Sequence, residues 1–501
     1  MKDTSERPAS HVESNEALRA DLLERFAAHP FADLETYKYF NQKGEHARQT
    51  KEVFVETALG GFTPEAPQFI YPALDLDDLV AHRERLSSIL QDLLRLDMNQ
   101  EENRLLREKV TERMHEVGIM ILTKLQSEMS ADDPAYSAIS YQLGENMREV
   151  YGAPEPEHWR GILGYRLSLL SAVENRDDAP EEVRKAWAFI RDHLPMGLPI
   201  EQPYQPRSDT IAWYGQRLDD RLAPAREAVK RAINEGEIAL DENGKLDANN
   251  IIKATRIALQ ARGAHGWGAE STDESNIDTT QSERNIFIPE SRVMSLKQFD
   301  MVIQSHEIDE HVMRRVNGDN SGEPILGGTG CSGYLAWEEG NGKTNEALLK
   351  GRITNEDAAF NYYISGGLVL GLDNPQKEGR NFGETFDLVW RMRYVSAFLE
   401  GKLPDDIQSS QRDIMSKTFD SLCRIFRGTD GQVPGVVFTK DAMTYYVGQT
   451  EVWRKWDRDM EALNEEDRVA EHRLERSAKI NPLRPDHHRV AKRAMSQSHA
   501  F

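Results

Sequence analysis

Apolar residues recur at helical spacing through most of the chain, and the clearest case begins just after residue 295. Its apolar positions, three and four residues apart, are Leu296, Phe299, Val302 and Ile303. Ser295 with Gln298 three residues later has the form of a capping box, and Asn317-Gly318 supplies a stop signal. This pattern predicts a helix over 296–316.

Similar patterns predict that helices dominate the whole chain. They cover about 101–128, 157–173, 181–192, 208–235, 384–401, 408–427 and 440–464. The five residues 285–289, Asn-Ile-Phe-Ile-Pro, instead predict a short edge strand directly before the helix over 296–316. We therefore expect an α+β fold that is predominantly α-helical and contains a small sheet.

The two ends of the chain differ from the rest. Residues 1–15 are polar and lack periodicity, so we expect a disordered N-terminus followed by an N-terminal helical region over 16–239. From residue 471 onward the chain carries seven Lys or Arg against three acidic residues. This balance predicts that the tail, 466–501, is a mobile basic arm.

Composition and charge narrow the function classes. The 501 residues are 39% hydrophobic and 29% charged, with no apolar run near 18 residues, so we expect no membrane span. The start has no apolar signal-peptide region, which makes the cytoplasm the default location. A net charge of −22 argues against nucleic acid or an anionic membrane as the main partner.

The candidate chemistry lies in the predicted helix over 296–316, in the sequence His306-Glu-Ile-Asp-Glu-His311. In the common zinc-peptidase pattern, two histidines at i and i+4 lie about 40° apart on one helical face. Here the second histidine is at i+5, roughly 140° away on an ideal helix. The two imidazoles can share one ion only if the helix widens, so a metal site predicts a distorted turn at 307–310. The alternative is a pair of ordinary i,i+4 polar contacts on a solvated face.

A third ligand could come from residues 327–340, a Gly-rich loop followed by an apolar run that ends in Glu338-Glu339. Two neutral imidazoles, one carboxylate and an open water position are the usual ligands of catalytic zinc. The same pair of glutamates could instead be solvated. The two cysteines, Cys331 and Cys423, form no CxxC pair and cannot build a disulfide framework.

The motif HEIxxHxxRxxNG resembles the family of the microtubule-associated tyrosine carboxypeptidases and the bacterial flavohemoglobin expression-modulating QEGLA motif proteins. Its residues here are His306, Glu307, Ile308, His311, Arg314, Asn317 and Gly318. Similar stretches occur in the same order at 71–77, 338–340, 423–428 and 438–441, so the resemblance spans roughly 65–455. The chain departs from the family where Glu-Gly-Leu-Ala becomes Glu339-Gly-Asn-Gly342.

The resemblance implies a zincin-like metallopeptidase core over 240–465 that binds one Zn²⁺ per chain. Its ligands would be His306, His311 and Glu339, with Glu338 as the other candidate, and Glu307 would be the general base. Zinc lowers the pKa of its bound water toward about 7 and polarises the scissile carbonyl, while the base moves the proton to the leaving amine.

The resemblance also implies a carboxypeptidase that removes a C-terminal aromatic residue, of Tyr or Phe type, from a peptide or protein. Such an enzyme needs a cation for the terminal carboxylate. The candidates are Arg314, Arg424, Arg427 and Lys440, and the candidate oxyanion donors are Tyr445 and Tyr446. Arg314 could instead hold the helix end, and the tyrosines could be packing residues.

Two alternatives to a zinc carboxypeptidase stay open. The first is a catalytically weak or inactive member of the family that binds peptides or a partner and keeps a structural metal. The second is a metal-free helical scaffold in which the histidine motif is coincidental.

Overall fold

The computed structural model describes residues 10–28, 34, 45–67, 69–71, 73–273, 277–351, 358–374, 376, 379–403 and 407–497. These residues are mostly helical and include a small sheet, which confirms the expected α+β, predominantly α-helical class. None of the helices in these ranges is long and apolar enough to cross a membrane.

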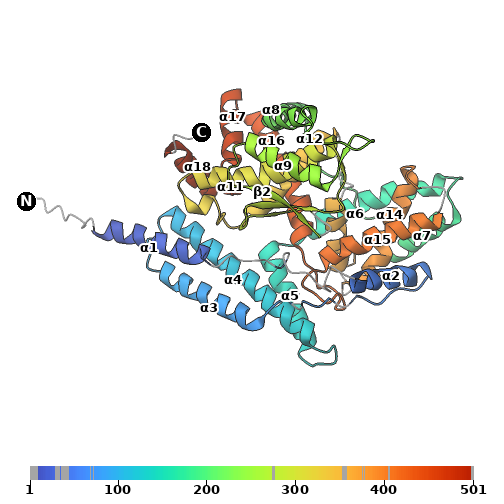
Figure 1. The fold of residues 1–501 in the computed structure, drawn as a ribbon. Coiled ribbons are helices and arrows are strands. Elements are labelled where there is room, and N and C mark those ends of the chain that lie inside the picture. The colour runs from blue at the N-terminus through green and yellow to red at the C-terminus, as the bar shows by residue number, and fades with distance from the viewer. Residues whose placement is uncertain are drawn as a thin grey trace, which may run out of the picture.

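Within the described ranges, eight α-helices precede the first strand (Figure 1). They are α1 (Ser10–Ala27), α2 (Glu45–Leu59), α3 (Leu76–Leu93), α4 (Glu101–Glu128), α5 (Tyr136–Tyr151), α6 (Pro156–Leu170), α7 (Glu181–His193) and α8 (Ser208–Asn234). Helix α1 begins at Ser10, so residues 10–15, which we expected to be disordered, are helical. Residues 1–9 lie outside the described ranges.

The largest apolar core joins α1–α7 to three later helices, α13 (Ala358–Val369), α14 (Phe382–Leu399) and α15 (Ile407–Ile425). Phe54 of α2 packs edge to face on Phe386 and Phe419, with ring centroids 4.8 and 5.0 Å apart. Trp159 of α6 donates its indole N–H to the carbonyl of Tyr363. Figure 1 shows α2, α6, α7, α14 and α15 gathered at one end of the molecule. The division expected at residues 239/240 therefore does not separate two cores.

A second apolar core lies between α8, α9 (Ala248–Ala261) and a three-stranded sheet. Its strands are β2 (Gly268–Thr272), β3 (Asp278–Thr280) and β4 (Asn285–Pro289), in the order β2-β4-β3. Strand β4 is parallel to β2 and antiparallel to β3. The strand predicted at 285–289 thus exists but is central, because both its edges are paired. The edge position that we assigned to β4 was wrong, because the outer strands of this sheet are β2 and β3.

The C-terminal part is packed into the structure. It contains α16 (Gly448–Ala462), α17 (Glu465–Glu475) and α18 (Pro485–Gln497). Residues 474–480, at the end of α17 and in the connection to α18, are all buried. Their cations Arg476 and Lys479 pair with buried carboxylates of other segments. The prediction of a mobile basic arm was wrong, because the excess positive charge of the tail neutralises negative charge inside the fold.

Candidate metal centre

The helix that carries both histidines begins as predicted and then widens. Ser295 and Gln298 form the capping box of α10 (Leu296–Phe299), which continues into a π-helical segment, η3 (Asp300–Val312), and then α11 (Met313–Asn320). The distorted turn predicted at 307–310 is confirmed, and the distortion covers 13 residues. Residues five apart bond to each other in a π-helix, so His306 and His311 share one face. Their ring centroids are 5.1 Å apart.

Helix α12 (Tyr334–Lys350) packs against η3 and brings Glu339 to these rings. One carboxylate oxygen lies 3.2 Å from Nε2 of His306, and the other lies 3.5 Å from Nε2 of His311. One ligand atom from each of the three residues falls within 4.8 Å of the other two. The structure thus brings together the three residues that the resemblance implies as ligands. Glu339, and not Glu338, faces both Nε2 atoms.

Two further carboxylates hold the opposite nitrogens of the histidines. Nδ1 of His306 lies 2.9 Å from Glu346, and Nδ1 of His311 lies 2.8 Å from Glu338. Since a carboxylate can only accept, each Nδ1 carries the proton, and Nε2 is the nitrogen that can bind a metal. Metal-binding histidines in proteins almost always have such a partner on the second nitrogen. Glu346 was missed in the sequence, although it follows Glu339 by seven residues and so lies on the same helical face.

Glu307 adjoins the site from η3 and is tied to the sheet. Its Oε2 accepts from the Thr279 hydroxyl of edge strand β3 at 2.6 Å. Just after that strand, Gln281 donates to the main-chain carbonyl of His311 at 3.3 Å. These bonds fix the edge of the sheet beside the histidine face of η3. Thr279 belongs to no recognisable motif, so its contact with Glu307 could not be predicted from the sequence.

The protonation states of the two histidines and of Glu339 follow from the close packing of several carboxylates around the two imidazoles. Burial opposes charge on His306, but bonds to Glu339 and Glu346 and the charge of Glu307 outweigh it and raise the pKa of His306 to about 10. The pKa of His311 is also raised, against burial, by Glu339 and Glu338. Burial works against ionisation of Glu339 as well, yet the two histidines lower its pKa to about 2. Without a metal, protonated imidazoles therefore supply the positive charge that the carboxylates require.

The departure from the family pattern at Asn341-Gly342 has a steric consequence. A Cβ built on Gly342 would lie 2.7 Å from Cε1 and Nδ1 of His306, closer than real contacts allow. The alanine that the family has at this position would push the ring away in this structure. Glycine at position 342 therefore leaves room for the His306 ring beside α12.

The two additional acidic residues of the motif, Asp309 and Glu310, are fully buried on another side of η3. Asp309 pairs with Arg221, Arg262 and Arg476 at 2.6 to 3.1 Å. Glu310 pairs with Arg476 and also accepts from Asn345 of α12. Both carboxylates therefore belong to an ion-pair network that anchors the π-helix, and neither faces solvent.

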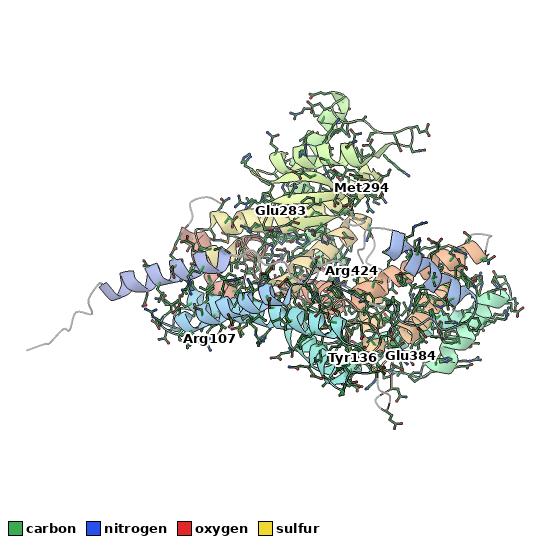
Figure 2. All side chains as sticks on the ribbon, turned by 60° about the horizontal axis from the view of Figure 1, so that its bottom comes forward. Arg107, Tyr136, Glu283, Met294, Glu384 and Arg424 are labelled. Atoms are coloured by element: carbon green, nitrogen blue, oxygen red, sulfur yellow. The ribbon has the colours of Figure 1, made fainter. Side chains whose placement is uncertain are left out.

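Two of the predicted substrate residues, Arg424 and Tyr445, lie near the part of α12 that carries Glu339 and Glu346. Arg424 donates to Asp441 at 2.6 Å and to the Tyr445 hydroxyl at 3.3 Å. Lys343, one turn after Glu339, lies 5.6 Å from the centre of the Tyr445 ring and donates to Glu346 at 2.8 Å. In Figure 2, Arg424 projects near the middle of the molecule. A partly exposed arginine is thus linked through Tyr445 and Lys343 to Glu346, which holds His306.

The other predicted substrate residues have different surroundings. Arg314 is fully buried and donates to the carbonyls of Ala478 and Ile480, which fits the alternative that it holds the helix. The remaining three contact aromatic rings: Arg427 lies over Phe438, Lys440 over Tyr151, and Tyr446 stacks on Tyr363. Cys331 is buried, and burial raises the pKa of its thiol to about 12.

Two more groups in the described ranges have ligand atoms close enough for a metal, but each holds a side-chain cation. The ammonium of Lys455 contacts all three members of the group Asp459, Glu471 and Glu475. The guanidinium of Arg484 bridges Glu108 and Asp486 of the group that includes His487. The centre formed by His306, His311 and Glu339 is the better candidate, because its imidazole nitrogens and its carboxylate face one another directly.

No protein-family model and no curated protein matches the chain.

We predict that zinc binding becomes tighter as the pH rises from 6 to 8. A metal at Nε2 must displace the proton that His306 carries below a pKa of about 10, so the proton is bound only in the metal-free state. Affinity should then rise about tenfold per pH unit for each proton released. Competition against a chelator of known pH dependence measures this slope. A flat profile would contradict the charge states described above.

Proposed function

We propose that the protein is a zinc-dependent peptidase that binds one Zn²⁺ per chain through His306, His311 and Glu339. The observation that carries the proposal is the orientation of the two histidines. Each Nδ1 is held by its own buried glutamate while both Nε2 atoms face a third carboxylate. Two imidazoles and one carboxylate leave a position for water, as in catalytic zinc sites.

The zinc would polarise the substrate carbonyl and lower the pKa of a bound water toward about 7. Glu307 is the base in this proposal, because it adjoins His306 in the motif and its Oε2 is fixed by Thr279. Its other oxygen can accept the proton of the attacking water and then pass it to the leaving amine. Holding one oxygen fixed keeps the other aimed at the reacting atoms, which is how positioning lowers a barrier.

Strand β3 supports a peptide as the substrate. It is one of the two edge strands of the sheet, it pairs with β4 on one side, and its Thr279 bonds to Glu307. An extended peptide can add to such an edge through main-chain hydrogen bonds. The scissile bond would then lie beside the histidine face of η3.

Arg424 supports a substrate with a free C-terminal carboxylate. Its guanidinium lies 5.3 Å from the centre of the Tyr362 ring and 5.6 Å from that of Tyr445. A planar cation beside two aromatic rings suits a carboxylate next to an aromatic side chain, because the fork binds the charge and the rings contact the side chain. We therefore propose a carboxypeptidase that favours C-terminal aromatic residues.

The burial of the ligands favours one alternative. The side chains of His306, His311 and Glu339 are only 8%, 11% and 13% exposed. A metal in so closed a site could be structural, and the protein would then bind a peptide or partner without cutting it.

Two single variants, His306→Ala and Glu307→Gln, separate a catalytic zinc site from a structural metal and from a metal-free scaffold. We expect about one zinc per wild-type chain, none in His306→Ala, and full zinc content in Glu307→Gln, because Glu307 is not a ligand. On peptides ending in Tyr or Phe, Glu307→Gln should lose 10²- to 10⁴-fold in kcat, the usual contribution of a general base. Metal analysis and peptide cleavage provide the two readouts.

Each other outcome points to a definite alternative. Zinc without cleavage in the wild type would favour the structural metal. A wild type without zinc would leave the metal-free scaffold.

Arg424→Lys tests recognition of the carboxylate. Lysine keeps the charge beside buried Asp441 but loses the bidentate fork, so we expect KM for free-acid peptides to rise about tenfold with little change in kcat. Arg412→Lys, on the exposed side of the same helix, is the matched control. If the wild type cleaves C-terminally amidated peptides as well as free acids, the assignment of Arg424 fails.

A further inference from the structure

The segment from residue 474 to 481, here called the C-terminal strap, contacts α11, which continues from the helix of the histidines, and the loop before α12, the helix of the glutamates. On one side its main chain bonds to the loop before α12: the Cys331 N–H donates to the Lys479 carbonyl at 3.0 Å, and the Lys479 N–H donates to the Leu326 carbonyl at 2.8 Å. The strap thus fixes the approach to the helix of Glu338 and Glu339.

On its other side the strap is held by α11, which continues directly from the π-helix. Arg314 donates to the carbonyls of Ala478 and Ile480 at 3.1 and 2.8 Å. Asn317 donates to the carbonyl of Arg476 at 3.0 Å. The strap therefore connects the helix of the histidines to the helix of the glutamates, although it lies more than 120 residues after the end of either.

One side chain of the strap reaches the metal-site residues. Nζ of Lys479 donates to Oε1 of Glu338 at 3.1 Å, and the same oxygen accepts from Nδ1 of His311 at 2.8 Å. Lys479 is 2% exposed and Glu338 is 1% exposed. The Tyr334 hydroxyl also lies 3.4 Å from the ammonium and limits its position. Lys479 and His311 thus share one carboxylate oxygen in the interior of the protein.

In such an arrangement the orientation of the Glu338 carboxylate depends on Lys479. Removing one partner of a buried ion pair leaves an uncompensated charge, which is strongly unfavourable. The next cation, the Arg314 guanidinium, has its Nε 3.7 Å from the second oxygen of Glu338, and it bonds to the strap carbonyls through Nε and Nη2 only. Without Lys479, the carboxylate would turn toward Arg314 and away from His311.

We propose that Lys479 is a positioning residue of the metal centre, which fixes Glu338 and through it aims Nε2 of His311 at the metal. This role rests on the proposed zinc site but not on any substrate. Loss of a residue that orients a metal ligand typically weakens metal binding 10- to 100-fold.

The test is zinc affinity of the full chain, measured by chelator competition, in Lys479→Met. The strap should stay docked in this variant, because Arg476, Arg314 and Asn317 keep their bonds. We expect zinc binding to weaken 10- to 100-fold. Lys492→Met, an exposed lysine on α18, is the matched control and should bind as the wild type does.

A double-mutant cycle separates positioning from a general loss of structure. If Lys479 acts through Glu338, the double variant Lys479→Met, Glu338→Gln should bind zinc within about twofold of Glu338→Gln alone. If the two losses multiply, Lys479 does not act through Glu338 and the proposal is overturned.

Lys479→Gln covers the case in which Lys479→Met does not fold. Glutamine keeps a donor toward Glu338 without the charge, so we expect an affinity between those of the wild type and Glu338→Gln. Wild-type affinity in every folded Lys479 variant would overturn the positioning role alone. A wild type that binds no zinc would instead overturn the proposed function on which it rests.

Discussion

The fold of the candidate site depends on the wide turn of the π-helix. In an α-helix, residues 306 and 311 would point in different directions, whereas i→i+5 bonding places them on one face. Such a helix is less favourable than an α-helix and persists only where its surroundings stabilise it. Here Asn345 donates to both the Ser305 carbonyl and Glu310, and Gly342 leaves room for the His306 ring. Helix α12 therefore supplies a metal-site carboxylate and also stabilises the π-helix.

Charge balance in the interior links the site to distant parts of the chain. Asp309, Glu310 and Glu338 are each at most 1% exposed, and a buried carboxylate is tolerated only with paired cations. Those cations come from α8, from the end of α9 and from the C-terminal strap, namely Arg221, Arg262, Arg476 and Lys479. Four cations of a chain with a net charge of −22 thus lie around the π-helix and α12.

What could be predicted from the sequence was local. Ser295, Gln298 and the i+5 spacing of the histidines depend only on near neighbours, and they correctly predicted the start of the helix and its distortion. The ligand role of Glu339 was one of two choices, and only the packing of α12 on η3 shows which glutamate faces both Nε2 atoms.

The errors have one physical origin, because each depends on partners far along the chain. Residues 285–289 have strand character, but nothing local shows that β2 covers one edge and β3 the other. The tail was predicted to be mobile because its charges have no local partners, while their partners are Asp309, Glu310 and Glu338. Thr279 and Lys343 were missed for the same reason, since neither belongs to a motif.

We claim that two imidazoles and one carboxylate form a zinc site, and X-ray absorption at the zinc edge reports the ligands of such a site. For the zinc-loaded wild-type chain we expect two nitrogen neighbours at about 2.0–2.1 Å with imidazole outer-shell scattering and oxygen neighbours at about 2.0–2.2 Å. His306→Ala should lose this signal. A sulfur neighbour at about 2.3 Å, or a zinc site without imidazole scattering, would contradict the claim.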